Sequence, residues 1–334
     1  MVVEDLLLSV LGEARTTGIL ARVGRSAEVK APSADTPVLP AQLAEALGLA
    51  LFAGLLERVP SGAAYVESKA ALGEKVVFDH GALRTVLWPN NGALPAGRAA
   101  IARVLGPLGY VQQDVYPLPA LRMTGYAYTH KQFSETLPQY FVSELHPEQF
   151  SVPFQDAVTA VLASSREPLS TFDKWLFAKL VTNGKLPFNE ACAVLKAAVS
   201  CFARQHDNPT LHAYEALKAE SAEMAWIATE GNVFNHATDR VADVVAVAEA
   251  QRDAGRAIKA LVEISASGRV RQTALLADKV SRDFVLADGS MQAMHVPGSF
   301  YEFISRDCLP GSAALDLAFD SGNATGIFKV TANT

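Results

Sequence analysis

One sequence pattern occurs twice in this chain. Residues 78–84 read Phe-Asp-His-Gly-Ala-Leu-Arg and residues 234–240 read Phe-Asn-His-Ala-Thr-Asp-Arg, so both segments fit F-x-H-x-x-x-R. A segment rich in aromatic residues follows each copy and carries a glutamate: Glu144 lies 64 residues after the first histidine, and Glu302 lies 66 residues after the second. This recurrence indicates a duplicated module. We expect two histidines and one carboxylate from the two copies to meet around a metal ion.

Composition limits the classes of protein that the chain can be. Its 334 residues are 50% apolar and 19% charged, which is enough to bury a large core in one domain or in two closely joined ones. The net charge is −6 and no run of Lys or Arg exceeds two residues, so nucleic acid is not an expected partner. The three cysteines lack C-x-x-C spacing, which argues against a disulfide framework and against a thiolate zinc site.

Two further features bear on cellular location. The N-terminus, Met1 to Asp5, is acidic where a signal peptide would be basic. The longest apolar stretch, residues 46–56, is too short to span a bilayer and is flanked by glutamates, so it predicts a buried helix and no membrane contact. We therefore expect a cytoplasmic protein.

Apolar periodicity predicts the same order of elements in both halves. In the first half, we expect a helix at 95–105 and strands at 75–86, 110–116, 121–129 and 139–145. In the second half, we expect a helix at 239–256, a tight turn at Asp288-Gly289, and strands at 232–236, 258–265, 270–280, 283–286 and 299–305. The order in the first half is βαβββ, and the second half repeats it with one additional predicted strand.

The chain divides into five predicted parts. These are an N-terminal helical segment (1–70), a first βαβββ module (71–153), a helical insertion (154–230), a second βαβββ module (231–310) and a C-terminal tail (311–334). The insertion is either a lid or plain structural packing. The βαβββ order resembles the module of the vicinal oxygen chelate (glyoxalase-like) superfamily. This resemblance predicts an α+β fold in which two such modules form an incurved mixed sheet around a metal site.

The candidate metal ligands are His80, His236 and Glu302. Two neutral imidazoles and one carboxylate make the facial ligand set of non-haem Fe(II) oxygenases, although affinity alone discriminates poorly between first-row metals. Such a set leaves open positions for a bidentate 2-oxo acid and for dioxygen. Strands suit these ligands because alternate side chains point to the same face of a sheet.

Glu144 is the competing carboxylate. It occupies the same place in the first copy of the repeat as Glu302 does in the second, and the pattern does not decide between the two. The residues that follow it, Leu145-His146-Pro147, are also compatible with a structural carboxylate outside the metal's ligand set.

Arg84 lies four residues after His80, and an even separation on a strand places both side chains on one face. An inward guanidinium could bind a substrate carboxylate bidentately, while the alternative is a structural ion pair. Arg240 repeats the spacing after His236, but there we expect the chain to turn into a helix, which favours a structural role.

The remaining candidates are weaker. Five histidines have no partner at ligand spacing and are expected on the surface or in the core: His130, His146, His206, His212 and His295. Ser143 and Tyr128 are possible polar residues of a pocket. No glycine-rich phosphate loop, nucleophile elbow or dinucleotide fingerprint occurs.

Four segments together resemble the 2-oxoadipate dioxygenase/decarboxylase family, also called D-2-hydroxyglutarate synthase. They are Phe78–Thr85, Phe141–Leu145, Gly231–Arg240 and Gly298–Arg306, and the resemblance extends over about residues 1–310. It implies that His80, His236 and Glu302 hold Fe(II), that the substrate is bound at these ligands and at Arg84, and that Arg84 recognises the 2-oxo acid.

The reaction implied by this resemblance converts 2-oxoadipate and O2 to 2-hydroxyglutarate and CO2, a step of lysine catabolism. Two alternatives use the same scaffold. One is a glyoxalase-type lyase or isomerase with Zn, Ni or Mn as Lewis acid, which would need no oxygen and which an extra ligand or base at Glu144 would favour. The other is a binding protein without activity or metal. Longer family members contribute pocket residues beyond residue 334, whereas here residues 311–334 form a short tail.

Overall fold

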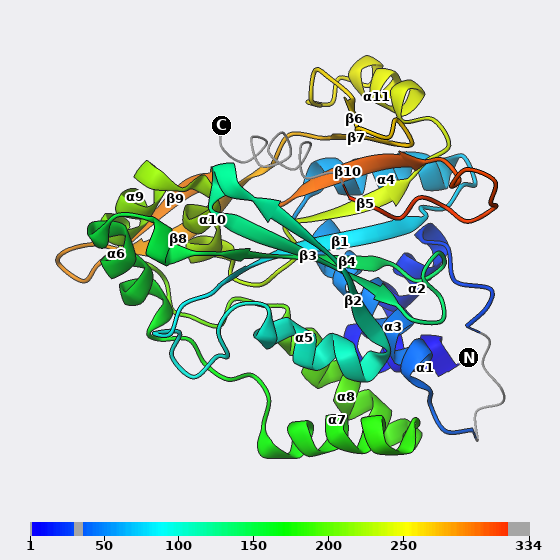
Figure 1. Cartoon of the computed structure of the whole chain (residues 1–334), viewed down its shortest axis with the longest axis horizontal. Coiled ribbons are helices and arrows are strands. Elements are labelled where there is room, and N and C mark those ends of the chain that lie inside the picture. Colours follow the sequence, from blue (N-terminus) through cyan, green and yellow to red (C-terminus); the bar gives the residue numbers. More distant parts are fainter. Residues whose placement is uncertain (1, 30–35, 320–334) are drawn as a thin grey trace.

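Two sets of strands join into one curled sheet. The computed structural model describes residues 2–29 and 36–319, which form a mixed α+β fold around an eight-stranded mixed sheet (Figure 1). The strand order is β2-β3-β4-β1-β5-β10-β7-β6. Its members are β1 (Phe78–Val86), β2 (Tyr110–Leu118), β3 (Met123–His130), β4 (Gln139–Leu145), β5 (His236–Arg240), β6 (Glu263–Ile264), β7 (Val270–Ala274) and β10 (Phe300–Arg306). The predicted incurved mixed sheet is confirmed.

The two halves of the sheet have the same internal arrangement. β1 and β5 pair antiparallel at the centre, β4 lies parallel to β1, and β10 lies parallel to β5. β3 and β7 then add antiparallel to β4 and β10, with β2 and β6 at the outer edges. The crossover helices are α5 (Ala99–Leu105) and α11 (Val244–Asp253). The repeat found in the sequence is therefore a repeat of topology.

The central strand of the second half differs from its prediction. Residues 236–240 form β5, whereas the sequence predicted a strand at 232–236 and a helix from 239. The helix begins later because Asp243 caps it, accepting hydrogen bonds from the backbone N–H groups of Val245 and Ala246. Arg240 therefore lies at the end of a strand.

A separate hairpin is inserted between β7 and β10. It consists of β8 (Lys279–Val285) and β9 (Met291–Pro297), joined by a turn that includes Asp288-Gly289, as predicted. Gly289 has a φ of 83°, a left-handed value that favours glycine. The predicted strand at 270–280 stops at Ala274. The sequence did not predict β9, because most of its side chains are exposed and show no apolar alternation.

Helices cover the sheet in two groups with separate apolar cores. The N-terminal helices are α1 (Val2–Leu11), α2 (Glu13–Arg22), α3 (Pro40–Leu56) and α4 (Pro60–Ala71), and those between the halves are α6 (Val152–Leu162), α7 (Thr171–Asn183), α8 (Phe188–Cys201), α9 (Leu211–Glu220) and α10 (Ala222–Glu230). α1, α3 and α8 share one core with the central strands, while α6, α9 and α10 pack with the β8–β9 hairpin in a second core. α3, apolar almost all round, contains the predicted buried helix at 46–56. Each of the two cores contains residues from several of the five predicted parts. The division into five parts therefore stays a prediction.

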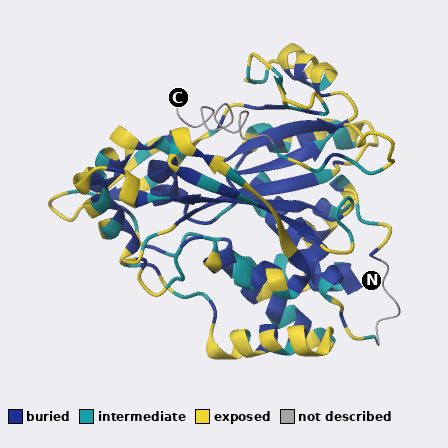
Figure 2. Ribbon diagram, in the orientation of Figure 1, coloured by how far each residue is buried: buried dark blue, intermediate teal, exposed yellow. Residues whose placement is uncertain are grey.

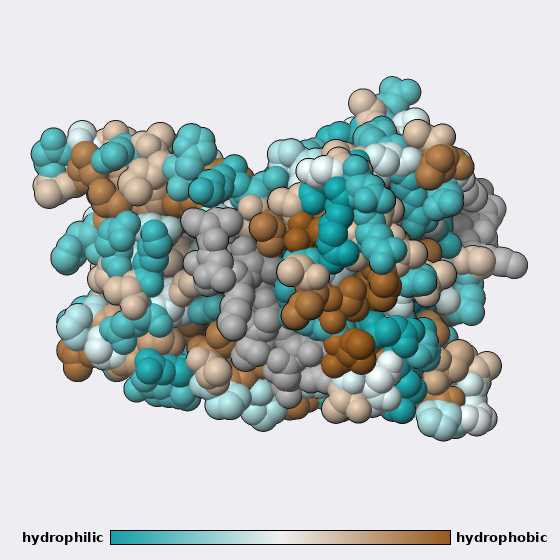
Figure 3. Space-filling model, turned by 90° about the horizontal axis from the view of Figure 1, so that it is seen from above, coloured by the Kyte–Doolittle hydropathy of each residue, from teal (hydrophilic) through white to brown (hydrophobic). Residues whose placement is uncertain are grey.

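The central strands are buried along their length, whereas α7, α11 and the outer part of β2 are largely exposed (Figure 2). On the face seen from above, hydrophilic residues cover much of the surface and a group of hydrophobic residues lies near the middle (Figure 3). Within residues 2–29 and 36–319, no helix combines the length and the apolar character that crossing a membrane requires.

Alternation along β1 gives the sheet two chemically distinct faces. Leu83 packs in the core with α3 and α8, on what we call the helix face. His80, Ala82 and Arg84 point to the opposite side, which we call the site face. Gly81 lies on the helix face, where an added Cβ would come within 2.3 Å of the ring of Phe234.

We expect Gly81→Ala to lower the free energy of unfolding by about 1–3 kcal/mol, because a methyl group there overpacks the core against Phe234. Gly106→Ala is the matched control, since a Cβ at Gly106 meets nothing within 4 Å and should change stability by less than about 0.5 kcal/mol. Chemical denaturation followed by circular dichroism measures both. Equal denaturation midpoints would show that the Phe234 ring moves aside freely.

Candidate metal centre

The three predicted ligands come from the three central strands. His80 lies on β1, His236 is the first residue of β5, and Glu302 is the third residue of β10. In the strand register, His80 is opposite Thr238, and Thr238 is opposite Glu302. His80, Thr238 and Glu302 therefore form one row across the sheet. His236 lies two residues before Thr238 on β5 and points to the same face.

The three side chains converge in the interior. One ligand atom from each of His80, His236 and Glu302 lies within 4.8 Å of the others, and all three residues are buried. Glu302 Oε2 is 3.2 Å from His80 Nε2 and 3.4 Å from His236 Nε2. Thr238 Oγ1 donates to Glu302 Oε2 at 2.6 Å and lies 3.1 Å from His80 Nε2. The imidazole nitrogens that face the carboxylate are those that a shared metal ion would use.

Burial and mutual charge set the protonation of this group in the absence of metal. Burial alone would lower the pKa of His80, but hydrogen bonds to Asp79 and Glu302 raise it above its usual value. Burial would raise the pKa of Glu302, but the two histidines and Thr238 lower it. Burial lowers the pKa of His236 to about 3. Without metal, Glu302 is therefore a carboxylate and His236 is a neutral imidazole. The neighbouring carboxylates favour the charged form of His80.

This donor set fits a divalent cation. Burying a carboxylate costs several kcal/mol unless charge and hydrogen bonds compensate it. Glu302 Oε2 has Thr238 and the histidines near it, but its other oxygen, Oε1, is buried and has no hydrogen-bond partner among the described residues. Two imidazole nitrogens and one carboxylate oxygen match the ligands that Fe(II), Mn(II) and Zn(II) accept.

Each histidine is oriented by the residue before it. His80 Nδ1 is 2.8 Å from Asp79 Oδ1, and His236 Nδ1 is 3.3 Å from Asn235 Oδ1. An ionised carboxylate is only an acceptor, so His80 Nδ1 donates and its Nε2 is directed toward Glu302. Arg306 forms a buried ion pair with Asp79, at 2.9 Å between Nη2 and Oδ1.

Arg84 lies on the same face as the ligands, as predicted. Its side chain is buried, its guanidinium carbon is 5.0 Å from the Trp226 ring on α10, and burial lowers its pKa to about 10, which keeps it charged. Its backbone carbonyl accepts a hydrogen bond from Asn232 Nδ2. Ser143, also buried, is opposite Arg84 in the register and so faces the same side, whereas Tyr128 pairs with Tyr140 and lies on the helix face.

Glu144 lies outside the centre, because the strand register differs from the sequence spacing. Phe300 is opposite His236, and Gln139 is opposite His80, so the structural counterpart of Glu302 is Phe141. Glu144 is three residues further along β4, and an odd offset turns a side chain to the other face. On the helix face its Oε2 accepts from Arg98 N at 2.8 Å. The sequence spacing was wrong in giving Glu144 and Glu302 the same place.

Arg240 and the other histidines have structural contacts. Arg240 Nη2 donates to the carbonyl of Glu135, in agreement with the structural role favoured from the sequence. His130, His146 and His206 hydrogen-bond to nearby protein groups, and His212 and His295 are exposed.

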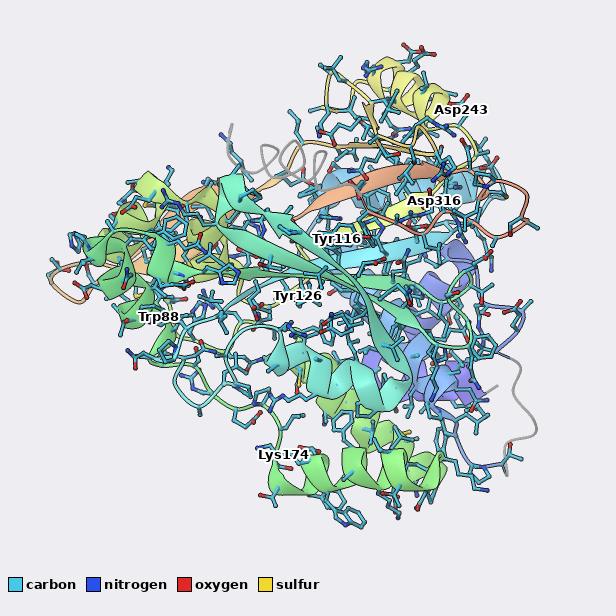
Figure 4. All side chains as sticks on the ribbon, viewed as in Figure 1. Trp88, Tyr116, Tyr126, Lys174, Asp243 and Asp316 are labelled. Carbon is cyan, nitrogen blue, oxygen red and sulfur yellow. The ribbon has the colours of Figure 1, made fainter. Side chains whose placement is uncertain are left out.

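A segment beyond β10 folds back over the site face. Residues 309–319, which we call the return segment, end with the Phe319 ring 4.9 Å from the rings of both His80 and Phe141. Phe319 N donates to Tyr116 Oη at 3.1 Å. Figure 4 labels Tyr116 on β2 and Asp316 in the return segment. The part of the predicted tail at 320–334 lies outside the described residues.

Sequence reasoning did not identify several residues of this centre. Asp79 and Thr238 stand inside the repeated pattern, where their proximity to the histidines was a usable signal. Gln139, Arg306 and Phe319 carried no such signal, because their contacts depend on strand pairing and on the path of the return segment. Gln139 is buried beside His80 in the register and donates weakly, at 3.4 Å, to the carbonyl of Leu317.

Glu302→Gln and Glu144→Gln form a matched pair, since each exchanges a buried carboxylate for an amide. We expect the change at Glu302 to weaken Mn(II) binding by at least about 100-fold, because it removes the anionic ligand. The change at Glu144 should leave the affinity unaltered. Calorimetric titration of the metal-free proteins measures both, and a similar loss in the two variants would contradict this assignment of faces.

Comparison with known proteins places the chain in a family. The sequence pattern of the 2-oxoadipate dioxygenase/decarboxylase family matches residues 54–329. A glyoxalase superfamily protein from Ralstonia eutropha JMP134 has 49% sequence identity and a TM-score of 0.92, with 96% of this chain and 98% of that chain covered.

Two hydroxyglutarate synthases share the fold at lower identity. The Oryza sativa protein, solved with 2-oxoadipate, has a TM-score of 0.67 and 21% identity, covering 91% of this chain and 98% of that one. The Pseudomonas putida protein has a TM-score of 0.56 and 21% identity, covering 90% and 75%. A search of curated proteins found no significant match. By the match over residues 54–329, this chain belongs to the 2-oxoadipate dioxygenase/decarboxylase family.

Proposed function

We propose that this protein is an Fe(II)-dependent dioxygenase that decarboxylates a 2-oxo dicarboxylic acid. The reaction we assign is 2-oxoadipate and O2 to 2-hydroxyglutarate and CO2, which would place the enzyme in lysine catabolism. The observation that carries the proposal is the convergence of His80, His236 and Glu302 within 4.8 Å, with Arg84 on the same face. Family membership and the 2-oxoadipate bound to the Oryza sativa hydroxyglutarate synthase support the choice of acid.

In this proposal the three ligands hold the metal at one face of the three central strands. Bound Fe(II) would offer open positions for the keto and carboxylate oxygens of the 2-oxo acid and for dioxygen, and it would pass to dioxygen the electrons that oxidation of the acid releases. Thr238 donates to Oε2 of Glu302 and so keeps that carboxylate in one orientation. Asp79 does the same for His80.

Arg84 binds a substrate carboxylate in this proposal. Its Cα lies about 13 Å from that of His80, since four residues of extended strand span this distance. A dicarboxylate held at the ligands by its 2-oxo acid end can direct its far carboxylate toward the guanidinium, which is planar and suited to bidentate contact. The Trp226 ring against that guanidinium restricts its orientation.

Aromatic side chains shield the ligand side of the site from water. Phe319 lies against both His80 and Phe141, and Tyr116 is 5.9 Å from Phe319 between ring centroids. A dry site strengthens the electrostatic interactions inside it and protects reactive intermediates from solvent. This aromatic wall suits an oxidation whose intermediates must not escape.

The glyoxalase-type alternative loses the support that Glu144 would have given it, because that carboxylate lies on the helix face. The alternative of an inactive binding protein requires that no metal be held. Metal analysis of protein purified without added iron distinguishes that alternative from both enzymes.

Iron-loaded protein should consume O2 and 2-oxoadipate in equal amounts and release one CO2 for each 2-hydroxyglutarate formed. An oxygen electrode and chromatographic analysis of the acids measure this ratio, with metal-free protein as the control. Turnover that continues without oxygen would reject the dioxygenase in favour of a lyase or isomerase. No turnover of any 2-oxo dicarboxylate would reject the proposed activity.

Arg84→Ala should leave metal binding unchanged and raise the KM for 2-oxoadipate by about 10-fold to 100-fold, because it removes hydrogen bonds to a charged group. His80→Ala should abolish metal binding itself. Steady-state kinetics and metal titration on both variants separate the two roles. Equal metal loss in the two variants would refute the role given to Arg84.

A further inference from the structure

The residue before each histidine is the point at which the two copies of the repeat differ chemically. The first copy has Asp79 before His80, and the second has Asn235 before His236. Both side-chain oxygens lie within hydrogen-bond distance of the following Nδ1, at 2.8 and 3.3 Å. The geometry is shared, but one partner carries a charge and the other is a neutral amide.

Asp79 is itself fixed by a buried guanidinium. Arg306 Nη2 donates to Asp79 Oδ1 at 2.9 Å, and Nε donates to Oδ2 at 3.0 Å, which makes a two-pronged ion pair. Both side chains are almost fully buried. Such a fork holds the carboxylate in one plane and in its ionised form, and it keeps Oδ1, the oxygen that faces His80 Nδ1, in place.

The rest of the Arg306 guanidinium binds the return segment. Nη1 donates to the carbonyls of Asp316 and Ala318, each at 2.9 Å. The next residue, Phe319, packs its ring against His80 at 4.9 Å and lies 5.4 Å from the guanidinium carbon of Arg306. One side chain therefore connects the partner of a metal ligand to the segment that covers that ligand.

We infer that Asp79 and Arg306 are positioning residues of the metal centre, which fix the Nδ1–H form of His80 and link this ligand to the return segment. His236, held by a neutral amide, is the less constrained ligand of the two. Carboxylate–histidine–metal arrangements raise the basicity of the ligand, and their loss typically costs 10-fold to 100-fold in metal affinity. The inference rests on the proposed function only in taking His80 and His236 as metal ligands.

The test compares two variants that each weaken the ion pair of a buried carboxylate with an arginine. Asp79→Asn gives both copies of the repeat the sequence F-N-H. Glu230→Gln is the control, because Glu230 is 3% exposed and forms a two-pronged ion pair with Arg282, at 2.7 Å for both contacts, while the Arg282 side chain is 26% exposed. Co(II) serves as the probe, since the same ligands bind it and its visible absorption reports ligand geometry.

We expect Asp79→Asn to weaken Co(II) binding by about 10-fold to 100-fold and to shift the visible absorption bands. Glu230→Gln should leave both unchanged while lowering the thermal unfolding midpoint of the metal-free protein. A purely structural role for Asp79 would lower the unfolding midpoint of Asp79→Asn with unaltered Co(II) affinity and spectrum, and that result would overturn the inference.

Arg306→Lys provides a second variant, which keeps the charge opposite Asp79 but cannot reach both carbonyls of the return segment. We expect Co(II) to slow amide hydrogen exchange at Phe319 in the wild type and to slow it less in Arg306→Lys. Identical exchange in the two proteins would overturn the link to the return segment.

These readouts need neither 2-oxoadipate nor oxygen, so they separate this inference from the proposed reaction. Wild-type protein that binds Co(II) but does not turn over any 2-oxo acid leaves the positioning role standing and rejects the reaction. Wild-type protein that binds no divalent metal overturns both.

Discussion

The antiparallel pairing of β1 with β5 is the contact on which the centre depends. It joins the two halves of the sheet and places Thr238 opposite His80, while the parallel pairing of β5 with β10 places Glu302 opposite Thr238. Because side chains alternate between faces, a shift of one residue at either pairing would move one of the three candidate ligands to the helix face. The packing of Phe234 over Gly81 fixes this register from behind.

The two buried carboxylates of Glu302 and Asp79 are compensated in different ways. The buried carboxylate of Glu302 has only histidine and hydroxyl partners among the described residues, which leaves it suited to a cation. Asp79, by contrast, is already paired with the positive charge of Arg306. Its Oδ1 also accepts a hydrogen bond from His80 Nδ1. These two acidic groups, on β1 and β10, thus have different tasks, set by whether an arginine is present beside them.

The surrounding helices and the return segment cover the side chains of the site face. α10 brings Trp226 against Arg84 on one side, and residues 309–319 bring Phe319 against His80 on another. Helices α1, α3 and α8 contribute to the core behind the sheet and keep the three central strands rigid. A site built on such strands holds its ligands in place better than one built on loops.

The sequence by itself determined the chemical groups and the order of elements. The repeated pattern identified His80, His236 and Arg84, and the even spacing of His80 and Arg84 placed them on one face, since alternation is a local property of a strand. The βαβββ order was likewise readable, because it depends on local periodicity and turn residues.

Only the tertiary structure decided which groups meet. Glu144 and Glu302 have nearly equal spacing in the sequence, yet the strand register turns Glu144 to the opposite face, and register is set by pairing between distant segments. The partnership of Asp79 with Arg306 spans 227 residues and left no mark in local sequence. Contacts of this kind depend on the packed chain, so the repeated pattern predicted that two histidines and a carboxylate meet, but spacing alone could not decide between the two glutamates or name Arg306 as the partner of Asp79.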